Sequence, residues 1–211
     1  MIQRACSVFF ALAALLPAQQ SKVIPSGMDN VEGPLVYTYP FGRVDGGLCI
    51  LYDADQITTT SNGVILGVNF RPSQQTQTAL GYTKPYRVTM YTVPMTAAQM
   101  MALGSPVNPA VIIGTAVPTV VFNGPVTLPS IGPLATAPGA FNINIPFTTP
   151  YLFDGTQGNL FMMLETTDTT PVTATYRIDA VLFRNTVAEG IAADIDTLGC
   201  AAAGATVRSE E

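Results

Sequence analysis

The sequence predicts an all-β fold, an antiparallel β-sandwich of jelly-roll type with one short helix at about residues 96–103. Short apolar segments with period-two alternation recur along the 211 residues. They are separated by connections rich in the 18 glycines and 17 prolines, where turns are expected. Because no regular series of helices alternates with the strands, a parallel α/β sheet is excluded.

The first three predicted strands lie before residue 94. Residues 48–52 form an apolar run that ends at Asp53. Residues 64–70 alternate between two sets of side chains and stop before Pro72. Residues 86–93 alternate more regularly. These patterns predict three strands, each with at least one buried face.

The single predicted helix comes next. Thr96 precedes a run of Ala, Gln, Met and Leu residues, and Gly104 ends this run. Thr96 has the hydroxyl group favoured at an N-cap, and Gln99 follows it at the spacing of a capping box. Met100 and Leu103 are expected to pack against the sheet.

Strand patterns return in four later segments, residues 117–122 with 126–128, 141–145, 160–164 and 175–183. Asn123-Gly124 interrupts the first of these segments and predicts a hairpin turn there. The turn-forming residues 154–158 precede the third. Between Gly104 and Pro118 the pattern has no clear period, so we expect irregular structure.

The chain is expected to divide into three parts. Residues 1–18 have the order of a secretory signal, with Arg4 before an apolar run and Ala18 at the cleavage point. An N-terminal anchor is the alternative, but the run is shorter than the roughly 20 residues that span a bilayer. Residues 19–187 form the β-sandwich domain, and residues 188–211 form a tail with a short helix and a frayed end. We expect a protein secreted to the extracellular space or the cell surface, without membrane insertion after signal cleavage.

Two cysteines remain once the signal, which contains Cys6, is removed. In an oxidising compartment, Cys49 and Cys200 are able to form a disulfide between the first strand region and the tail. The alternative is that Cys49 is a small buried core residue. The residues alone leave both interpretations open.

Several segments together resemble a group of secreted bacterial β-sandwich proteins. The similar segments are Ile24-Pro25, residues 30–33 (N-V-E-G), 39–42 (Y-P-F-G), 65–72 (I-L-G-V-N-F-R-P) and 146–160, which resembles a late hairpin. Such proteins are mostly uncharacterised surface or extracellular domains. The resemblance implies a jelly-roll-like fold and an extracellular location rather than a particular ligand.

The composition excludes several classes of function. The chain has no histidine, so Ser-His-Asp catalysis, Cys-His catalysis and imidazole metal sites are impossible within it. With 9 basic and 14 acidic residues it lacks the basic surface that nucleic-acid binding requires. A carboxylate pair for glycoside hydrolysis would have to come from Asp53, Asp55, Asp154, Glu165, Asp168 and Asp179, but nothing in the sequence indicates that two of these side chains approach each other in a cleft. We predict that the protein is not an enzyme and needs no cofactor, with calcium as the one alternative.

Asp53 and Asp55 are the candidate calcium ligands. They follow the predicted strand 48–52 at alternate positions, so both carboxylates are able to face one cation. The alternative is that they are loop residues that cap turns.

Two classes of function remain. The first is a non-catalytic structural or interaction module of a bacterial surface or extracellular matrix, whose partners are other surface proteins or copies of itself. Apolar loops such as residues 106–121 are compatible with such contacts. The alternative is a carbohydrate-binding module, with or without a stabilising calcium ion, in which a polysaccharide stacks on Tyr37, Tyr39, Tyr82, Tyr86 and Tyr151. An apolar edge strand without charged residues favours the first class, and a row of exposed aromatic rings favours the second.

Overall fold

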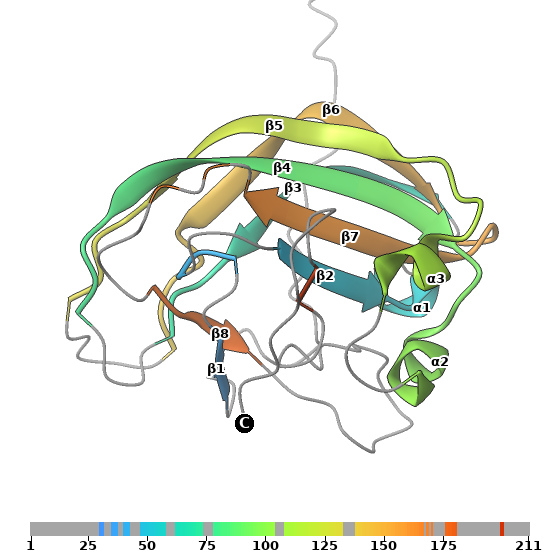
Figure 1. The fold of residues 1–211 in the computed structure, drawn as a ribbon, viewed down its shortest axis with the longest axis horizontal. Coiled ribbons are helices and arrows are strands. Elements are labelled where there is room, and N and C mark those ends of the chain that lie inside the picture. The colour runs from blue at the N-terminus through green and yellow to red at the C-terminus, as the bar shows by residue number, and fades with distance from the viewer. Residues whose placement is uncertain are drawn as a thin grey trace, which may run out of the picture.

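The computed structural model describes residues 30–31, 35–37, 40–42, 47–57, 62–73, 78–103, 108–132, 138–166, 168, 170, 176–180 and 199–200. The predicted signal, Tyr39 and the predicted tail helix lie outside these residues. The described part of the chain consists mainly of antiparallel strands with three short helices (Figure 1). The predicted all-β antiparallel class is therefore confirmed.

Five strands form the largest sheet. Their order across the sheet is β5 (Thr119–Leu128), β4 (Tyr82–Val93), β7 (Asn159–Thr166), β2 (Gly47–Tyr52) and β9 (Gly199–Cys200). β9 falls inside the predicted tail, so part of that tail returns to the sheet next to β2.

Four strands pair outside this sheet. β3 (Asn62–Phe70) pairs with β6 (Ile143–Asp154), and β1 (Leu35–Tyr37) pairs with β8 (Ile178–Ala180). β8 lies inside the strand predicted at residues 175–183. Thr148 Oγ1 of β6 donates to the backbone oxygen of Val121 in β5 at 3.1 Å, so the β3–β6 ribbon meets the large sheet at this strand.

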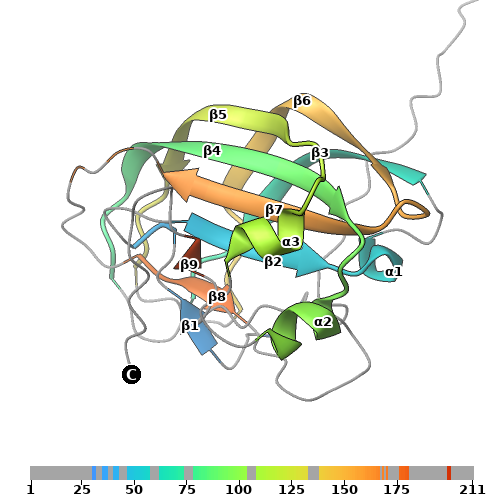
Figure 2. The same ribbon diagram turned by 45° about the vertical axis from the view of Figure 1, so that its right-hand side comes forward.

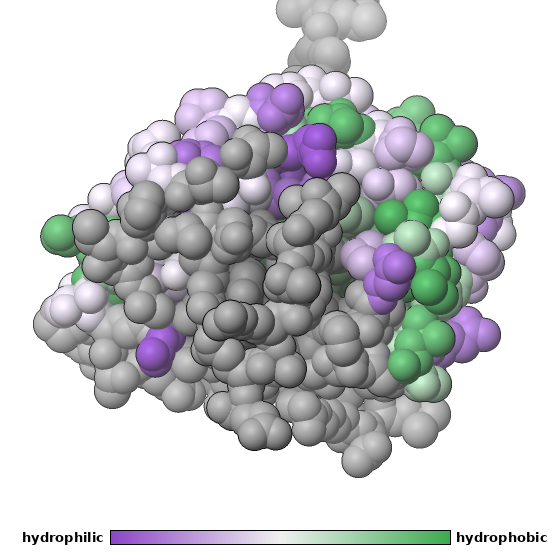
Figure 3. All heavy atoms as spheres, in the orientation of Figure 1, coloured by the Kyte–Doolittle hydropathy of each residue, from purple (hydrophilic) through white to green (hydrophobic). Residues whose placement is uncertain are grey.

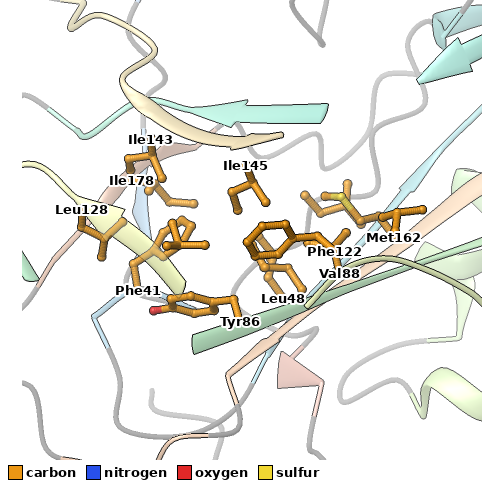
Figure 4. Close-up of a cluster of buried hydrophobic side chains, with 14 of the residues drawn as sticks. Phe41, Leu48, Tyr86, Val88, Phe122, Leu128, Ile143, Ile145, Met162 and Ile178 are labelled. Carbon is orange, nitrogen blue, oxygen red and sulfur yellow. The ribbon is translucent and has the colours of Figure 1, made fainter. Parts of the chain in front are cut away.

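The main core lies between the β3–β6 ribbon and one face of the large sheet (Figure 4). Ile143 and Ile145 of β6 are fully buried there, as the alternation at residues 141–145 predicts. They pack in the same cluster as Leu48 of β2, Val88 of β4 and Met162 of β7. Burying an aliphatic side chain of this size contributes about 1.5–3 kcal/mol, so this layer supplies much of the stability.

Two of the helices, α2 and α3, cover the opposite face of the large sheet. α2 (Ala97–Ala102) and α3 (Pro109–Ile113) contribute Ala97, Met100 and Ile112 to a second cluster, which also contains Leu51 and Phe161. Figure 2 shows α3 in front of β7 and β2, with α2 beside it. α1 (Ala54–Ile57) directly follows β2. None of these helices, in the part of the chain that is described, has the length and apolar run needed to cross a membrane.

The capping box predicted at Thr96 and Gln99 is confirmed. Gln99 N–H donates to Thr96 Oγ1 at 3.2 Å, and Thr96 N–H donates to Gln99 Oε1 at 2.8 Å. Two amides without intrahelical acceptors are thereby satisfied at the start of α2.

The expectation of a single helix is wrong, because α1 and α3 form as well. α3 lies in the region expected to be irregular. Its N-cap, Asn108, accepts the N–H of Ala110 on Oδ1 at 3.0 Å, and Pro109 occupies the first turn. Gly114 ends the helix with a φ of 54°, a conformation that favours glycine.

The hairpin predicted at Asn123-Gly124 is also wrong. β5 continues through both residues, and Asn123 pairs with Arg87 of β4. β5 is the last strand of its sheet among the described residues, so Pro125 is tolerated although it has no N–H to donate. Pro125 stands opposite Pro85, which places both prolines at a position where the two strands exchange no hydrogen bonds.

The late hairpin implied by the resemblance does not form. The turn at residues 154–158 is present, but β6 pairs with β3 whereas β7 pairs with β4 and β2. This turn therefore carries the chain from one sheet to the other.

Gly158 permits this crossing, because its φ is 146° and a Cβ atom there would lie 2.5 Å from the oxygen of Val93. We expect Gly158→Ala to lower the free energy of unfolding by about 3 kcal/mol, since it adds both a backbone conformation that Ala disfavours and a backbone clash. Gly63→Ala is the matched control, because a Cβ there meets nothing within 4 Å. Urea unfolding followed by circular dichroism measures both; equal stability of the two variants would contradict the role of Gly158.

Candidate functional site

Asp53 and Asn159 join β2, β7 and α2 in one polar junction. Asp53 Oδ1 accepts the N–H of Ala97 in the first turn of α2 at 2.9 Å. Asn159 accepts the N–H of Ala54 on Oδ1 and donates from Nδ2 to the oxygen of Met95, both at 2.9 Å. These bonds hold the start of α2 against the ends of the two strands.

The junction gives Asp53 a structural role. Partial burial raises the pKa of this carboxyl group, the hydrogen bond from Ala97 opposes the rise, and the charge of Asp55 adds to it. Asp55 is exposed on α1. In the described residues, no three Cys, Asp or Glu side chains form a group that could hold a metal ion. Asp53 thus accepts a long-range hydrogen bond from the start of α2 rather than capping a local turn, and calcium binding by Asp53 and Asp55 stays a prediction.

Other carboxylates of the described residues also form hydrogen bonds or ion pairs with neighbouring groups. Asp154 and Asp168 each accept the backbone and hydroxyl hydrogens of a threonine two residues later, and the bond from the hydroxyl is the main cause that lowers the pKa of each. Glu165 is buried in β7 and accepts from Arg87 Nη2 at 2.9 Å. Arg87 stands directly opposite it in β4, so this pair compensates a buried charge within the sheet.

The predicted tyrosine platform is wrong for two of its five members. Tyr86 and Tyr151 are buried in the main core, which leaves no ring face for a sugar. The Tyr151 hydroxyl lies 2.9 Å from Thr92 Oγ1, a bond that joins β6 to β4. Tyr82 is half-buried against the same core. Tyr37 lies in β1, where only its backbone is described, and Tyr39 lies outside the described residues.

Cys49 is buried in β2 and is disulfide-bonded. The pairing of β9 with β2 places Cys200 opposite Gly47, two residues from Cys49. Both interpretations of Cys49 therefore hold in part, since it is a buried residue that also forms a bridge. That Cys200 is its partner stays a prediction.

The most distinctive surface is apolar. Exposed aliphatic side chains follow α2, lie on α3 and continue to the start of β5; we call Leu103, Val111, Val117 and Val120 the α2–α3 surface. The expectation that Leu103 packs against the sheet is therefore wrong, because this residue lies just after the end of α2 and is exposed. Figure 3 shows hydrophobic residues gathered over α2 and α3 at the right-hand side of the molecule. Val111 is 55% exposed and Val117 is 80% exposed, so these side chains face solvent although the neighbouring Ile112 is buried.

The sequence contains one indication of this surface, an absence of charge, although it matches no known motif. No charged residue occurs between Arg87 and Asp154. This stretch contains α2, α3, β5 and most of β6. A surface helix ordinarily carries polar or charged residues on its outer face. The elements of this stretch therefore carry uncharged residues on their outer surfaces as well as in the core.

The junction at Asp53 gives a prediction for pH dependence. Asp53→Asn keeps an oxygen that accepts from Ala97 but removes the titrating group, whereas Asp53→Ala removes the acceptor. The pKa in the folded state is raised above its ordinary value of 3.8. The stability that this group contributes is therefore present in acid and lost as the pH rises through the raised pKa. Asp53→Asn should gain stability relative to the wild type over that window.

Relative to Asp53→Asn, Asp53→Ala should lose about 1 kcal/mol at every pH, because the acceptor for the Ala97 N–H is missing and neither variant titrates at this position. Urea unfolding at a series of pH values measures both variants. An Asp53→Asn curve parallel to the wild type would contradict the raised pKa, and an Asp53→Ala variant as stable as Asp53→Asn would contradict the role of this hydrogen bond.

The cysteine bridge gives a second prediction. We expect peptide mapping without reduction to join the peptide of Cys49 to that of Cys200. Cys49→Ser and Cys200→Ser should then lower stability by a similar amount, about 4 kcal/mol for so long a loop. A peptide that joins Cys49 to Cys6 would contradict the assignment.

Comparison of the chain with protein-family models, with curated proteins and with solved structures finds no match.

Proposed function

We propose that the chain is a non-catalytic structural or interaction module, exported to a bacterial surface or extracellular matrix, and that its fold is a β-sandwich of jelly-roll type. The α2–α3 surface carries the proposal. It is apolar, it is built on well-capped structure, and it belongs to a stretch without charge. Such surfaces on folded domains are typical of protein contacts.

The position of α3 makes this surface a stable platform. Ile112 fixes the helix in the second cluster, while Asn108 and Gly114 define its two ends. Val111 is next to Ile112 on the outer side, so its orientation follows from the burial of its neighbour. A partner that covers Val111 and Val117 would gain apolar burial without removing any charge from water.

The same properties favour a protein over a polysaccharide. Sugar recognition requires convergent polar groups and exposed rings. The α2–α3 surface offers aliphatic side chains, and two of the five candidate tyrosines are buried. We therefore place the interaction function ahead of the carbohydrate-binding alternative.

The test compares two double variants of equal charge. Val111→Lys with Val117→Lys places two charges on the α2–α3 surface, whereas Asn144→Lys with Thr149→Lys places two on exposed positions of β6. Cross-linking on cells that export the protein identifies the bound protein, and titration calorimetry then measures its affinity for each variant. We expect the first variant to weaken binding by roughly tenfold per valine, because about 1.4 kcal/mol of burial is lost at each.

The control variant should bind as the wild type does. Equal binding by both variants would contradict the role of the α2–α3 surface. A failure to cross-link any protein partner would contradict the interaction function itself.

A further inference from the structure

The α2–α3 surface lies at one end of the fold, where several connections meet. β2 ends at Tyr52, opposite Leu160 in β7, and β4 ends at Val93, opposite Asn159. α1 follows β2 and α2 follows β4, and the polar junction of Asp53 and Asn159 holds both helices. Figures 1 and 2 show α1, α2 and α3 together at this end. α1 therefore lies at the border of the apolar surface.

The connections at this end carry negative charge. Residues 53–61, 94–118 and 154–158 contain three aspartates and no lysine or arginine. Asp55 on α1 is exposed, and within the described ranges no basic side chain forms an ion pair with it. Partial burial raises the pKa of Asp53, and the charge of Asp55 adds to the rise. The two carboxylates therefore repel each other, and a positive charge beside Asp55 would relieve this repulsion.

Charge also decides which occupant fits this end of the fold. A second copy is disfavoured, because three of the four basic residues in the described ranges are already engaged: Arg71 and Lys84 are buried, and Arg87 is paired with Glu165. A lipid surface is disfavoured as well, since anionic headgroups would repel Asp55. A separate polypeptide with its own basic residue meets neither difficulty.

We propose that the α2–α3 surface binds a polypeptide segment that combines aliphatic residues with lysine or arginine, and that Asp55 selects for the basic residue. The proposal rests on the interaction function and names the chemistry of the partner. The aliphatic residues cover Val111 and Val117, while the basic residue pairs with Asp55 at the border of the surface. Burial supplies most of the affinity, because an exposed ion pair contributes little. The charge determines which segments are accepted.

A displayed library of random peptides is the first probe. Selection on the full-chain wild type should enrich peptides that carry aliphatic residues and an excess of Lys and Arg over Asp and Glu. Selection on Asp55→Lys should also enrich aliphatic residues, but with an excess of Asp and Glu. Circular dichroism checks that each variant is folded.

The affinity of one selected, synthesised peptide is then measured by fluorescence anisotropy. Asp55→Asn should raise the dissociation constant about threefold, as expected for an exposed ion pair, and Asp55→Lys should raise it about tenfold. Asp168→Asn is the matched control, because it removes one carboxylate charge but keeps an oxygen that accepts from Thr170. Asp168 follows the far end of β7, whose eight residues extend over about 25 Å, well beyond the Debye length of ~8 Å. This control should bind the peptide as the wild type does.

A charge exchange tests whether the pairing is direct. A peptide in which Glu replaces the basic residue should bind Asp55→Lys more tightly than the wild type, the reverse of the order for the original peptide. A loss of folding would instead weaken the binding of both peptides.

Several outcomes would overturn the proposal. They are a selection that enriches no peptide, selected peptides without an excess of Lys and Arg, equal affinities of Asp55→Asn and Asp168→Asn, and a Glu peptide that does not prefer Asp55→Lys. Binding of the wild type to phosphatidylcholine vesicles in place of peptides would also overturn it, because the surface would then be a lipid contact.

Val111→Ser with Val117→Ser separates this proposal from the interaction function, because it removes apolar surface without adding charge. We expect this variant to bind the selected peptide at least tenfold more weakly. If it loses binding while Asp55→Asn does not, the interaction function stands and the chemistry assigned to the partner is wrong. If it binds a peptide that depends on Asp55 as tightly as the wild type does, the α2–α3 surface is wrong for both.

Discussion

β7 imposes the main constraint on this fold, because it runs through the large sheet and is buried on both faces. Leu160, Met162 and Leu164 face the main core, and Phe161 faces the helices. A strand that is apolar on both sides needs a covering layer on each side. The chain supplies the β3–β6 ribbon for one face and α2 with α3 for the other. The buried Glu165 in the same strand accordingly needs Arg87 beside it.

The sequence predicts the strands of this arrangement better than their connections. Alternation or a short apolar run locates β2, β3, β4 and β7, because these patterns report which faces are buried. Asn123-Gly124 misleads, since its turn preference is local whereas the pairing of β5 with β4 is not. α3 is too short for a helical period, although Asn108, Pro109 and Gly114 mark its ends.

The candidate site is less predictable, because the roles of its residues depend on tertiary contacts. The sequence around Tyr86 and Tyr151 does not distinguish an exposed ring from a buried one. The packing of β4 and β6 determines that both rings are buried. Asp53 is placed correctly after a strand, but its hydrogen bond to Ala97 connects residues far apart in the chain. The stretch without charge is visible in the sequence, yet its exposed residues can be identified only in the fold.

The need to cover β7 explains only some of the apolar residues in the uncharged stretch between Arg87 and Asp154. Burial requires apolar residues at the inward positions, such as Met100 and Ile112. It places no such requirement on Val111 or Val117, where a charged side chain would increase solubility without disturbing the core. Under the proposed interaction function, contact with a partner accounts for the uncharged outward residues on α3 and before β5. The acidic residues of the chain would then select among such partners, because like charges disfavour the approach of acidic ones.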